Sequence, residues 1–123
     1  MEKHFFKMIN EYDKQSDTLY LRVVDPYQYK ESIELADNII LDFDSENIPV
    51  ALEILDASKY FHVKPYALRN FALDMKIYIQ TDKITLNAKF IISTHHKKEE
   101  VPVNVGTIND IELPTMQTSY AVA

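Results

Sequence analysis

Hydrophobic and polar residues alternate along most of this chain, with the period of two that marks β-strands with one buried face. In the first half the alternation predicts strands over the ranges 5–11, 18–24, 31–35, 39–43 and 48–54. The last two form a hairpin whose inner face carries only apolar side chains: Ile39, Leu41, Phe43, Ile48, Val50, Leu52 and Ile54. A slip of one residue in the pairing of either strand would expose these apolar side chains to solvent, so the register is well specified.

The alternation stops after residue 54. Asp56 is predicted to be the N-cap of a short helix over residues 57–63, with its carboxylate accepting hydrogen bonds from the first-turn amides. Pro65 disfavours helical backbone at the residue before it. It therefore either ends this helix or begins a second short helix over residues 65–71.

Alternation returns in the last third of the chain. It predicts strands over 76–80, 84–94 and 101–105, and residues 118–122 form either a last strand or a frayed end. This order of elements predicts a single α+β domain over residues 1–123. An antiparallel β-meander is followed by one or two short helices and by a C-terminal antiparallel hairpin or meander. The two halves share one continuous sheet or form two subdomains, and both arrangements stay open.

Acidic and amide residues stand where the predicted turns lie. The chain has one glycine, Gly106, so Asn and Asp must supply most turn positions that need a positive φ. Asp13 and Asp17 bracket the first turn, and Asp44 begins the hairpin turn. A local backbone role accounts for each of these aspartates.

Composition narrows the classes of function. The 123 residues carry a net charge of −6 and only two arginines, Arg22 and Arg69, so a nucleic-acid binder with a basic stripe is not expected. No apolar run is long enough for a membrane span or a signal peptide, so no membrane association is expected. Cysteine is absent, which excludes disulfides and thiolate metal sites and fits a cytoplasmic protein.

Three phrases in the first half of the chain resemble the family called domain of unknown function 2283. They are Tyr12-Asp13 with Asp17 and Leu19-Tyr20-Leu21-Arg22, then Ile40-Leu41-Asp42-Phe43-Asp44, and then Glu53-Ile54-Leu55-Asp56-Ala57-Ser58. Asn47 stands where that family has glycine. The resemblance covers residues 8–60. The rest of the predicted helix and the C-terminal strands, residues 61–123, lie outside it. It implies a small prokaryotic cytoplasmic protein without established activity. Some members look like partners of small toxin-like proteins, which makes an antitoxin role conceivable.

One acidic spacing imitates a calcium loop. Asp42, Asp44, Glu46 and Glu53 fall at positions 1, 3, 5 and 12 of the EF-hand template. The predicted flanks are strands rather than helices, and Asn47 occupies the position that needs glycine. A hairpin turn with acidic residues is the simpler interpretation, so no metal site and no cofactor are predicted.

Four polar side chains, two of them shared with that spacing, form the main candidate site. Tyr20, Arg22, Asp42 and Glu53 are all predicted on the face opposite the apolar set. If their strands are adjacent, Arg22 can lie between two carboxylates. This is either a salt-bridge ladder on a solvated face or a surface for a ligand or protein partner.

Other chemistry-bearing residues favour structural roles. His95 and His96 are neighbours and would point to opposite faces of a strand, so a polar hairpin end is favoured over a shared metal. Neither a Ser-His-Asp elbow nor a glycine-rich phosphate loop is present, and no enzyme is predicted. The aromatic cluster around the helix is expected to be mostly core: Tyr60, Phe61, Tyr66 and Phe71.

Three functions remain. The leading one is a non-enzymatic interaction or self-assembly module, with homo-oligomers formed through the long low-charge strand over 84–94 if that strand is an unprotected edge. The second is an antitoxin-like partner of a small basic protein, steered by the acidic charge balance. The third is a carboxylate-based ligand- or metal-binding protein that uses Asp42, Asp44 and Glu53.

Overall fold

A computed structural model describes the backbone of residues 2–94 and 97–122, and the side chains of these residues from His4 onward. Nine strands form one sheet in the order β3-β4-β5-β2-β1-β9-β6-β7-β8. Their bounds are β1 Glu2–Asp13, β2 Thr18–Val23, β3 Tyr29–Ala36, β4 Ile39–Asp44, β5 Pro49–Ile54, β6 Phe71–Ile79, β7 Lys83–Thr94, β8 Lys97–Ile108 and β9 Met116–Val122. The first-half prediction of alternating strands is confirmed, and the question of one sheet or two subdomains is settled in favour of one sheet.

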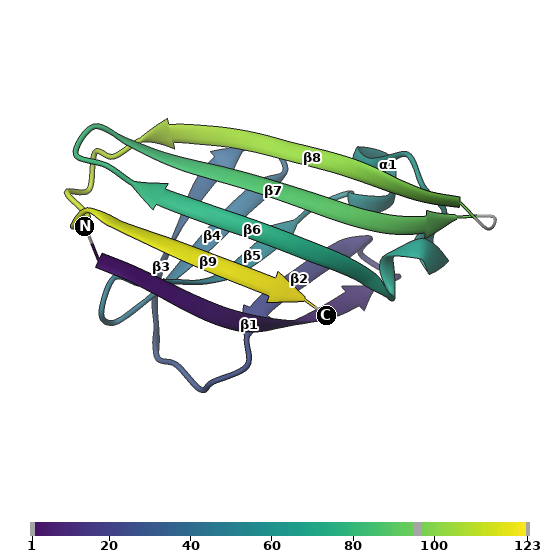
Figure 1. Cartoon of the computed structure of the whole chain (residues 1–123), viewed down its shortest axis with the longest axis horizontal. Coiled ribbons are helices and arrows are strands. Elements are labelled where there is room, and N and C mark those ends of the chain that lie inside the picture. The colour runs from purple at the N-terminus through teal and green to yellow at the C-terminus, as the bar shows by residue number, and fades with distance from the viewer. Residues whose placement is uncertain (1, 95–96, 123) are drawn as a thin grey trace.

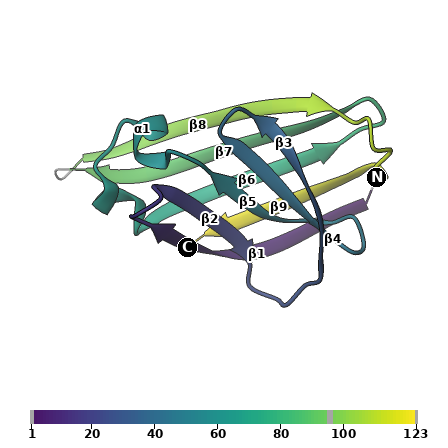
Figure 2. The ribbon, with the colours of Figure 1, turned by 180° about the vertical axis from the view of Figure 1, so that it is seen from behind.

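The sheet curls on itself into a half-barrel. Figure 1 shows β8, β7, β6, β9 and β1 in one layer, with β2, β5, β4 and β3 behind them. Figure 2 shows the same two layers from the other side, with helix α1 (Ala57–Phe61) beside the start of β8. The strands turn most of their apolar residues to the inside of the curl, so the described residues form one core between the two layers.

Strand β1 joins the two layers because it pairs differently along its length. Residues 2–7 pair with β9 in parallel, and residues 8–13 pair with β2 in antiparallel fashion. The N-terminal half of β1 therefore belongs to one layer and its C-terminal half to the other. This arrangement makes the family-like first half of the chain continuous with the C-terminal strands.

The core is built from the alternating positions that the sequence predicts. In the layer of β2, β5, β4 and β3, Leu41 lies opposite Leu52, and Leu52 lies opposite Leu21 on the next strand. All three side chains are fully buried. Across the core, the buried Tyr120 hydroxyl donates a hydrogen bond of 2.5 Å to the Pro49 carbonyl oxygen. This bond ties β9 to the start of β5.

The α+β prediction is wrong, because the fold is predominantly β. The helices α1 (Ala57–Phe61) and η1 (Pro65–Leu68, a 3₁₀ turn) have five and four residues, too few to form a layer. Strand β6 begins at Phe71, inside the range predicted as a second helix. Leu73 and Met75 lie opposite Phe90 and Ala88 in the ladder, so burial against β7 decides this segment in favour of a strand.

The C-terminal region departs from a simple meander. Strands β6, β7 and β8 are consecutive antiparallel neighbours, but β9 returns across them to lie between β1 and β6. Residues 118–122 are therefore part of a central strand. The long strand over 84–94 is β7, and it lies between β6 and β8. Strand β7 is not an edge strand. The argument that an unprotected edge at residues 84–94 would pair with another copy of the chain therefore fails.

The described edges are β3 and β8. Strand β8 carries Lys97, Lys98, Glu99 and Glu100 at its start and Pro102 in its middle, features that oppose pairing with another chain. Strand β8 begins at Lys97, before the strand predicted over residues 101–105, and ends at Ile108, after it. His95 and His96 lie outside the described residues. No helix in the described part of the chain is long and apolar enough to cross a membrane.

Candidate functional site

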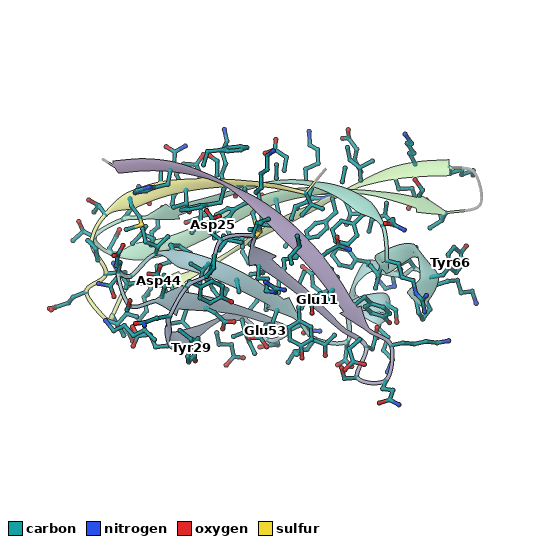
Figure 3. All side chains as sticks on the ribbon, turned by 90° about the horizontal axis from the view of Figure 1, so that it is seen from below. Glu11, Asp25, Tyr29, Asp44, Glu53 and Tyr66 are labelled. Carbon is teal, nitrogen blue, oxygen red and sulfur yellow. The ribbon has the colours of Figure 1, made fainter. Side chains whose placement is uncertain are left out.

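The four residues of the predicted site lie on the outer face of the layer formed by β2, β5, β4 and β3. Tyr20 is directly opposite Glu53, while Arg22 and Asp42 lie on either side of Ala51 in the neighbouring cross-strand row. Strand β5 therefore separates β2 from β4. Figure 3 shows Glu53 on this side of the molecule, with Glu11 and Tyr29 near it and Tyr66 at a distant end.

Arg22 does not lie between the two predicted carboxylates. Its Nη2 donates to Glu11 Oε1 at 2.9 Å, and its Nε donates to the same oxygen at 3.3 Å. Glu11 comes from β1, the neighbour of β2 on the other side. Both side chains are largely exposed, so this ion pair contributes only about 0.2–1 kcal/mol to stability. The predicted salt-bridge ladder is reduced to this one pair.

Asp42 and Glu53 form a pair of neighbouring carboxyl groups. Asp42 is only 9% exposed, and Ser32 Oγ donates to its Oδ1 at 2.5 Å. Tyr29 Oη lies 2.7 Å from Ser32 Oγ and completes a short chain of hydroxyls that leads to the surface. Burial raises the pKa of Glu53 to about 7, and the hydrogen bond to Asp42 and the negative charge of Asp42 add to this rise. Glu53 therefore titrates near neutral pH.

Tyr27 is a partly buried tyrosine whose hydroxyl lies near this outer face. It comes from the loop that leads from β2 to β3 across the β4–β5 turn, where the Gln28 carbonyl accepts from the Ser45 amide. Burial raises the pKa of Tyr27; the negative charges of Asp42 and Glu53 raise it further, and the charge of Arg22 lowers it. The hydroxyl is thus within electrostatic reach of all three. Ala51, between Asp42 and Arg22, is only 6% exposed, which fits a cover over this part of the sheet.

A second polar cluster joins the first turn to the helix. Asp17 Oδ1 accepts from Tyr12 Oη at 2.6 Å and from the Ser58 amide at 3.0 Å, and its Oδ2 accepts from Ser58 Oγ at 2.7 Å. Burial opposes ionisation of Asp17, but the hydrogen bonds from Tyr12 and Ser58 outweigh it and lower the pKa of Asp17. Burial, with the hydrogen bond to Asp17, raises the pKa of Tyr12 to about 12. This is a structural clamp in which every donor finds an acceptor.

The clamp corrects the prediction for Asp56. Asp56 adopts a left-handed backbone conformation, with φ of 51°, and its side chain makes no capping hydrogen bond. Asp17 caps the first turn of α1 instead, from 41 residues away in the chain. Asp17 therefore has a long-range role in addition to its place in a turn. The signal that could have revealed it is that Tyr12, Asp17 and Ser58 all belong to the phrases that carry the family resemblance.

Two other aspartates have the local turn roles that were predicted. Asp13 Oδ1 accepts from the Gln15 amide at 3.0 Å. Asp44 Oδ1 accepts from the amides of Glu46 and Ile48, each at 2.9 Å, and Asn47 takes the positive φ of that turn. Asp44 is thus occupied by backbone donors. Within the described residues, no group of three or more His, Asp or Glu side chains is placed to hold a metal ion.

The predicted aromatic cluster divides between core and surface. Phe61 and Phe71 both pack on Phe90, with ring centroids 4.8 and 5.6 Å away. Tyr60 packs edge-on against Phe61 at 5.2 Å. Tyr66 is 53% exposed at the end of the molecule. Three of the four rings are therefore structural.

Comparison with known proteins identifies relatives. The model of the family described as "Protein of unknown function (DUF2283)" matches residues 10–58. A Methanosarcina mazei protein named "Putative hypoxanthine phosphoribosyltransferase" is 30% identical over 105 residues, which span 85% of this chain and 84% of that protein. An uncharacterised protein of Methanocaldococcus jannaschii is 35% identical over 103 residues, 80% of this chain and 87% of that protein. No solved structure gives a significant match.

Proposed function

We propose a function on the premise that this chain belongs to the DUF2283 family of proteins of unknown function. The outer face of β1–β5 is a binding surface for a small basic protein, and the chain is an interaction module rather than an enzyme. The matched residues 10–58 hold β2 to β5 and the end of β1, so they build this face. The name of the Methanosarcina mazei relative describes an enzyme, and nothing in the geometry of this face supports extending it to this chain.

The Asp42–Glu53 pair is the observation that carries the proposal. Burial, the hydrogen bond with Asp42 and the repulsion between the two carboxyl groups together raise the pKa of Glu53 to about 7. A cationic group beside the pair would remove that repulsion and donate hydrogen bonds to both carboxylates in place of the proton. The pair therefore favours a partner that brings a positive charge.

The surroundings of the pair suit a protein surface. Tyr20 is 39% exposed and lies opposite Glu53, and Tyr29 is 60% exposed at the end of the hydroxyl chain. Glu11 lies on the other side of Tyr20 in the same cross-strand row. Exposed tyrosines are enriched in protein interfaces, and acidic neighbours favour basic partners. The net charge of −6 would also attract such a partner from a distance.

Calorimetric titration with a hexa-arginine peptide between pH 6 and pH 8 tests this function. Binding should tighten as the pH rises and release a proton from Glu53, which shows as a dependence of the heat on the ionisation enthalpy of the buffer. The variant Glu53→Gln should bind about tenfold more weakly at pH 8 and lose the pH dependence. Asp74→Asn, on the exposed outer face of β6, is the matched control and should bind like the parent chain.

Two results would overturn the proposal. One is an affinity that is equal at pH 6 and pH 8, or that Asp74→Asn reduces as much as Glu53→Gln does. The other is a saturable heat with calcium, magnesium or manganese that Glu53→Gln abolishes, which would assign the carboxyl pair to cation binding instead.

A further inference from the structure

A cleft at the other end of the molecule has the opposite charge. It has a volume of about 440 Å³ and lies between α1, the segment that follows it, the end of β7 and the start of β8. Figure 3 labels Tyr66 at this end, well away from Glu53. The volume lies within the range of about 300–1,000 Å³ that is usual for small-molecule sites.

Three of the residues lining the cleft are basic. Lys59, His62 and Lys64 line it, and Glu99 is the one acidic residue that does so. Lys64 forms no ion pair with another residue in the described part of the chain. Lys59 forms no close ion pair there either, although its charge helps to lower the pKa of Asp17. In a chain of net charge −6, such a local excess of positive charge is the exception. It makes the cleft attractive to an anion.

The end of helix α1 brings these basic residues together. Helix α1 ends at Phe61, and His62 adopts a left-handed conformation with φ of 56°. The His62 amide donates to the Lys59 carbonyl at 3.3 Å, and the Val63 amide donates to the Ser58 carbonyl at 3.0 Å. This reversal brings His62 and Lys64 to the same cleft as Lys59. Left-handed backbone is unfavourable for residues other than glycine, but it is a common way for a helix to end, and the two capping hydrogen bonds hold it here.

The cleft also offers an apolar surface. Tyr66 and Val63 line it beside the basic residues, and the Tyr66 side chain is 53% exposed. An exposed ring next to positive charges suits a ligand that has both a planar group and an anionic group. Ser58 lines the cleft too, but its hydroxyl proton is already donated to Asp17.

We propose that this cleft binds a small phosphate monoester with a planar aromatic body. Lys59, His62 and Lys64 would contact the phosphate, and Tyr66 would pack against the ring. A dianionic phosphate matches the excess of positive charge in the cleft better than a single carboxylate does. This site shares no residue with the Asp42–Glu53 surface, so the two proposals stand or fall separately.

Calorimetric titration with phenyl phosphate tests the inference. Benzoate, inorganic phosphate and phenol are titrated in the same way for comparison. Phenyl phosphate should bind more tightly than each of the other three, and its affinity should fall with added salt. Lys64→Gln should weaken phenyl phosphate about tenfold, the loss expected for one charged contact. Tyr66→Ala should remove the advantage of phenyl phosphate over inorganic phosphate and leave phosphate binding itself unchanged.

Lys76→Gln, on the outer face of β6, is the matched control and should leave the affinity unchanged. A thermal melt of each variant shows that the fold is intact. The inference is overturned if phenyl phosphate shows no saturable binding up to about 10 mM. It is also overturned if Lys76→Gln weakens binding as much as Lys64→Gln, or if benzoate binds as tightly as phenyl phosphate.

Discussion

Asp17 and Asp42 come from similar acidic phrases in the first half of the chain, and the fold places them in opposite situations. Asp17 accepts three hydrogen bonds, from the Tyr12 hydroxyl and from the amide and hydroxyl of Ser58. Asp42 accepts from Ser32 and faces a second carboxyl group, Glu53. The pKa of Asp17 is lowered, and that of Glu53, the neighbour of Asp42, is raised. A carboxylate surrounded by donors stabilises the fold, whereas a carboxyl pair short of positive charge is suited to binding.

The largest expected effect follows from replacing Asp17. Asp17→Asn should lower the free energy of unfolding by about 2 kcal/mol, because an amide replaces one acceptor oxygen and the charge that strengthens these hydrogen bonds is lost. Asp56→Asn is a closely matched control, since Asp56 has a φ of 51° and Asp17 a φ of 53°. Asn tolerates this conformation, so Asp56→Asn should change stability by less than about 0.5 kcal/mol. Urea denaturation at pH 7 measures both, and equal losses would show that Asp17 is an ordinary turn residue.

The acid limb of stability gives a second measurement on the same variant. A carboxyl group with a lowered folded-state pKa stabilises the protein above its unfolded pKa, and this contribution is lost as the pH falls through the folded pKa. The parent chain should therefore lose stability below pH values of about 4 more steeply than Asp17→Asn does. Parallel curves for the two proteins would contradict the lowered pKa of Asp17.

A smaller effect of opposite sign is expected at Glu53. Its pKa is raised from 4.5 to about 7, so its contribution to stability is fully present below pH 4.5 and is lost as the pH rises through 7. Glu53→Gln keeps a hydrogen-bond donor at every pH. The variant should be more stable than the parent at pH 8 by about 0.5–1 kcal/mol, a range that allows for solvent screening of this half-buried group.

The pH dependence separates this effect from a general loss of charge. Glu53→Gln should show no gain in stability at pH 4.5, where the parent side chain is already protonated in the folded state. Glu34→Gln removes an exposed carboxylate of β3 from the same outer face of the sheet. Its effect on stability should be the same at the two pH values. If both variants gain equally at pH 8, the effect belongs to net charge and not to the pair.

The smallest effect is expected at Ser32, the hydroxyl that donates to Asp42. Ser32→Ala should cost about 0.5 kcal/mol, because Ser32 is exposed and water can replace its hydrogen bond. Ser93→Ala, at an exposed position of β7, is the control and should be neutral. A loss at Ser32 as large as that at Asp17 would mean that Asp42 is also a structural clamp.

The alternation of apolar residues predicts strands well where the strand has one buried face. The hairpin of Ile39–Asp44 and Pro49–Ile54 follows directly from this pattern, as does the long strand over 84–94. The start of β6 was missed because Pro65 suggests a second short helix over residues 65–71, and the next strand was predicted to begin only at residue 76. Leu73 and Met75 lie between these two predicted elements. Their pairing with β7 decides their conformation, and such a long-range contact cannot be read from local sequence.

The candidate site was predicted in part. The shared outer face of Tyr20, Arg22, Asp42 and Glu53 follows from the period of two along their strands. The partner of Arg22 does not follow, because it depends on the sheet order, which places β1 and not β4 beside β2. The clamp at Asp17 was missed for a similar reason, since Ser58 is 41 residues away. Periodicity shows which way a side chain points, and topology decides what it meets.

The divided pairing of β1 also bears on how the chain can fold during synthesis. The first half of β1 and one side of β6 need β9 as their neighbour, and β9 is synthesised after the other eight strands of this sheet. Until then, both present unpaired backbone that can pair with another nascent chain. Premature termination before Met116 should therefore yield an aggregating product rather than a smaller folded domain. The pairing of β1 with β9 therefore completes the sheet only after all the other strands have been synthesised.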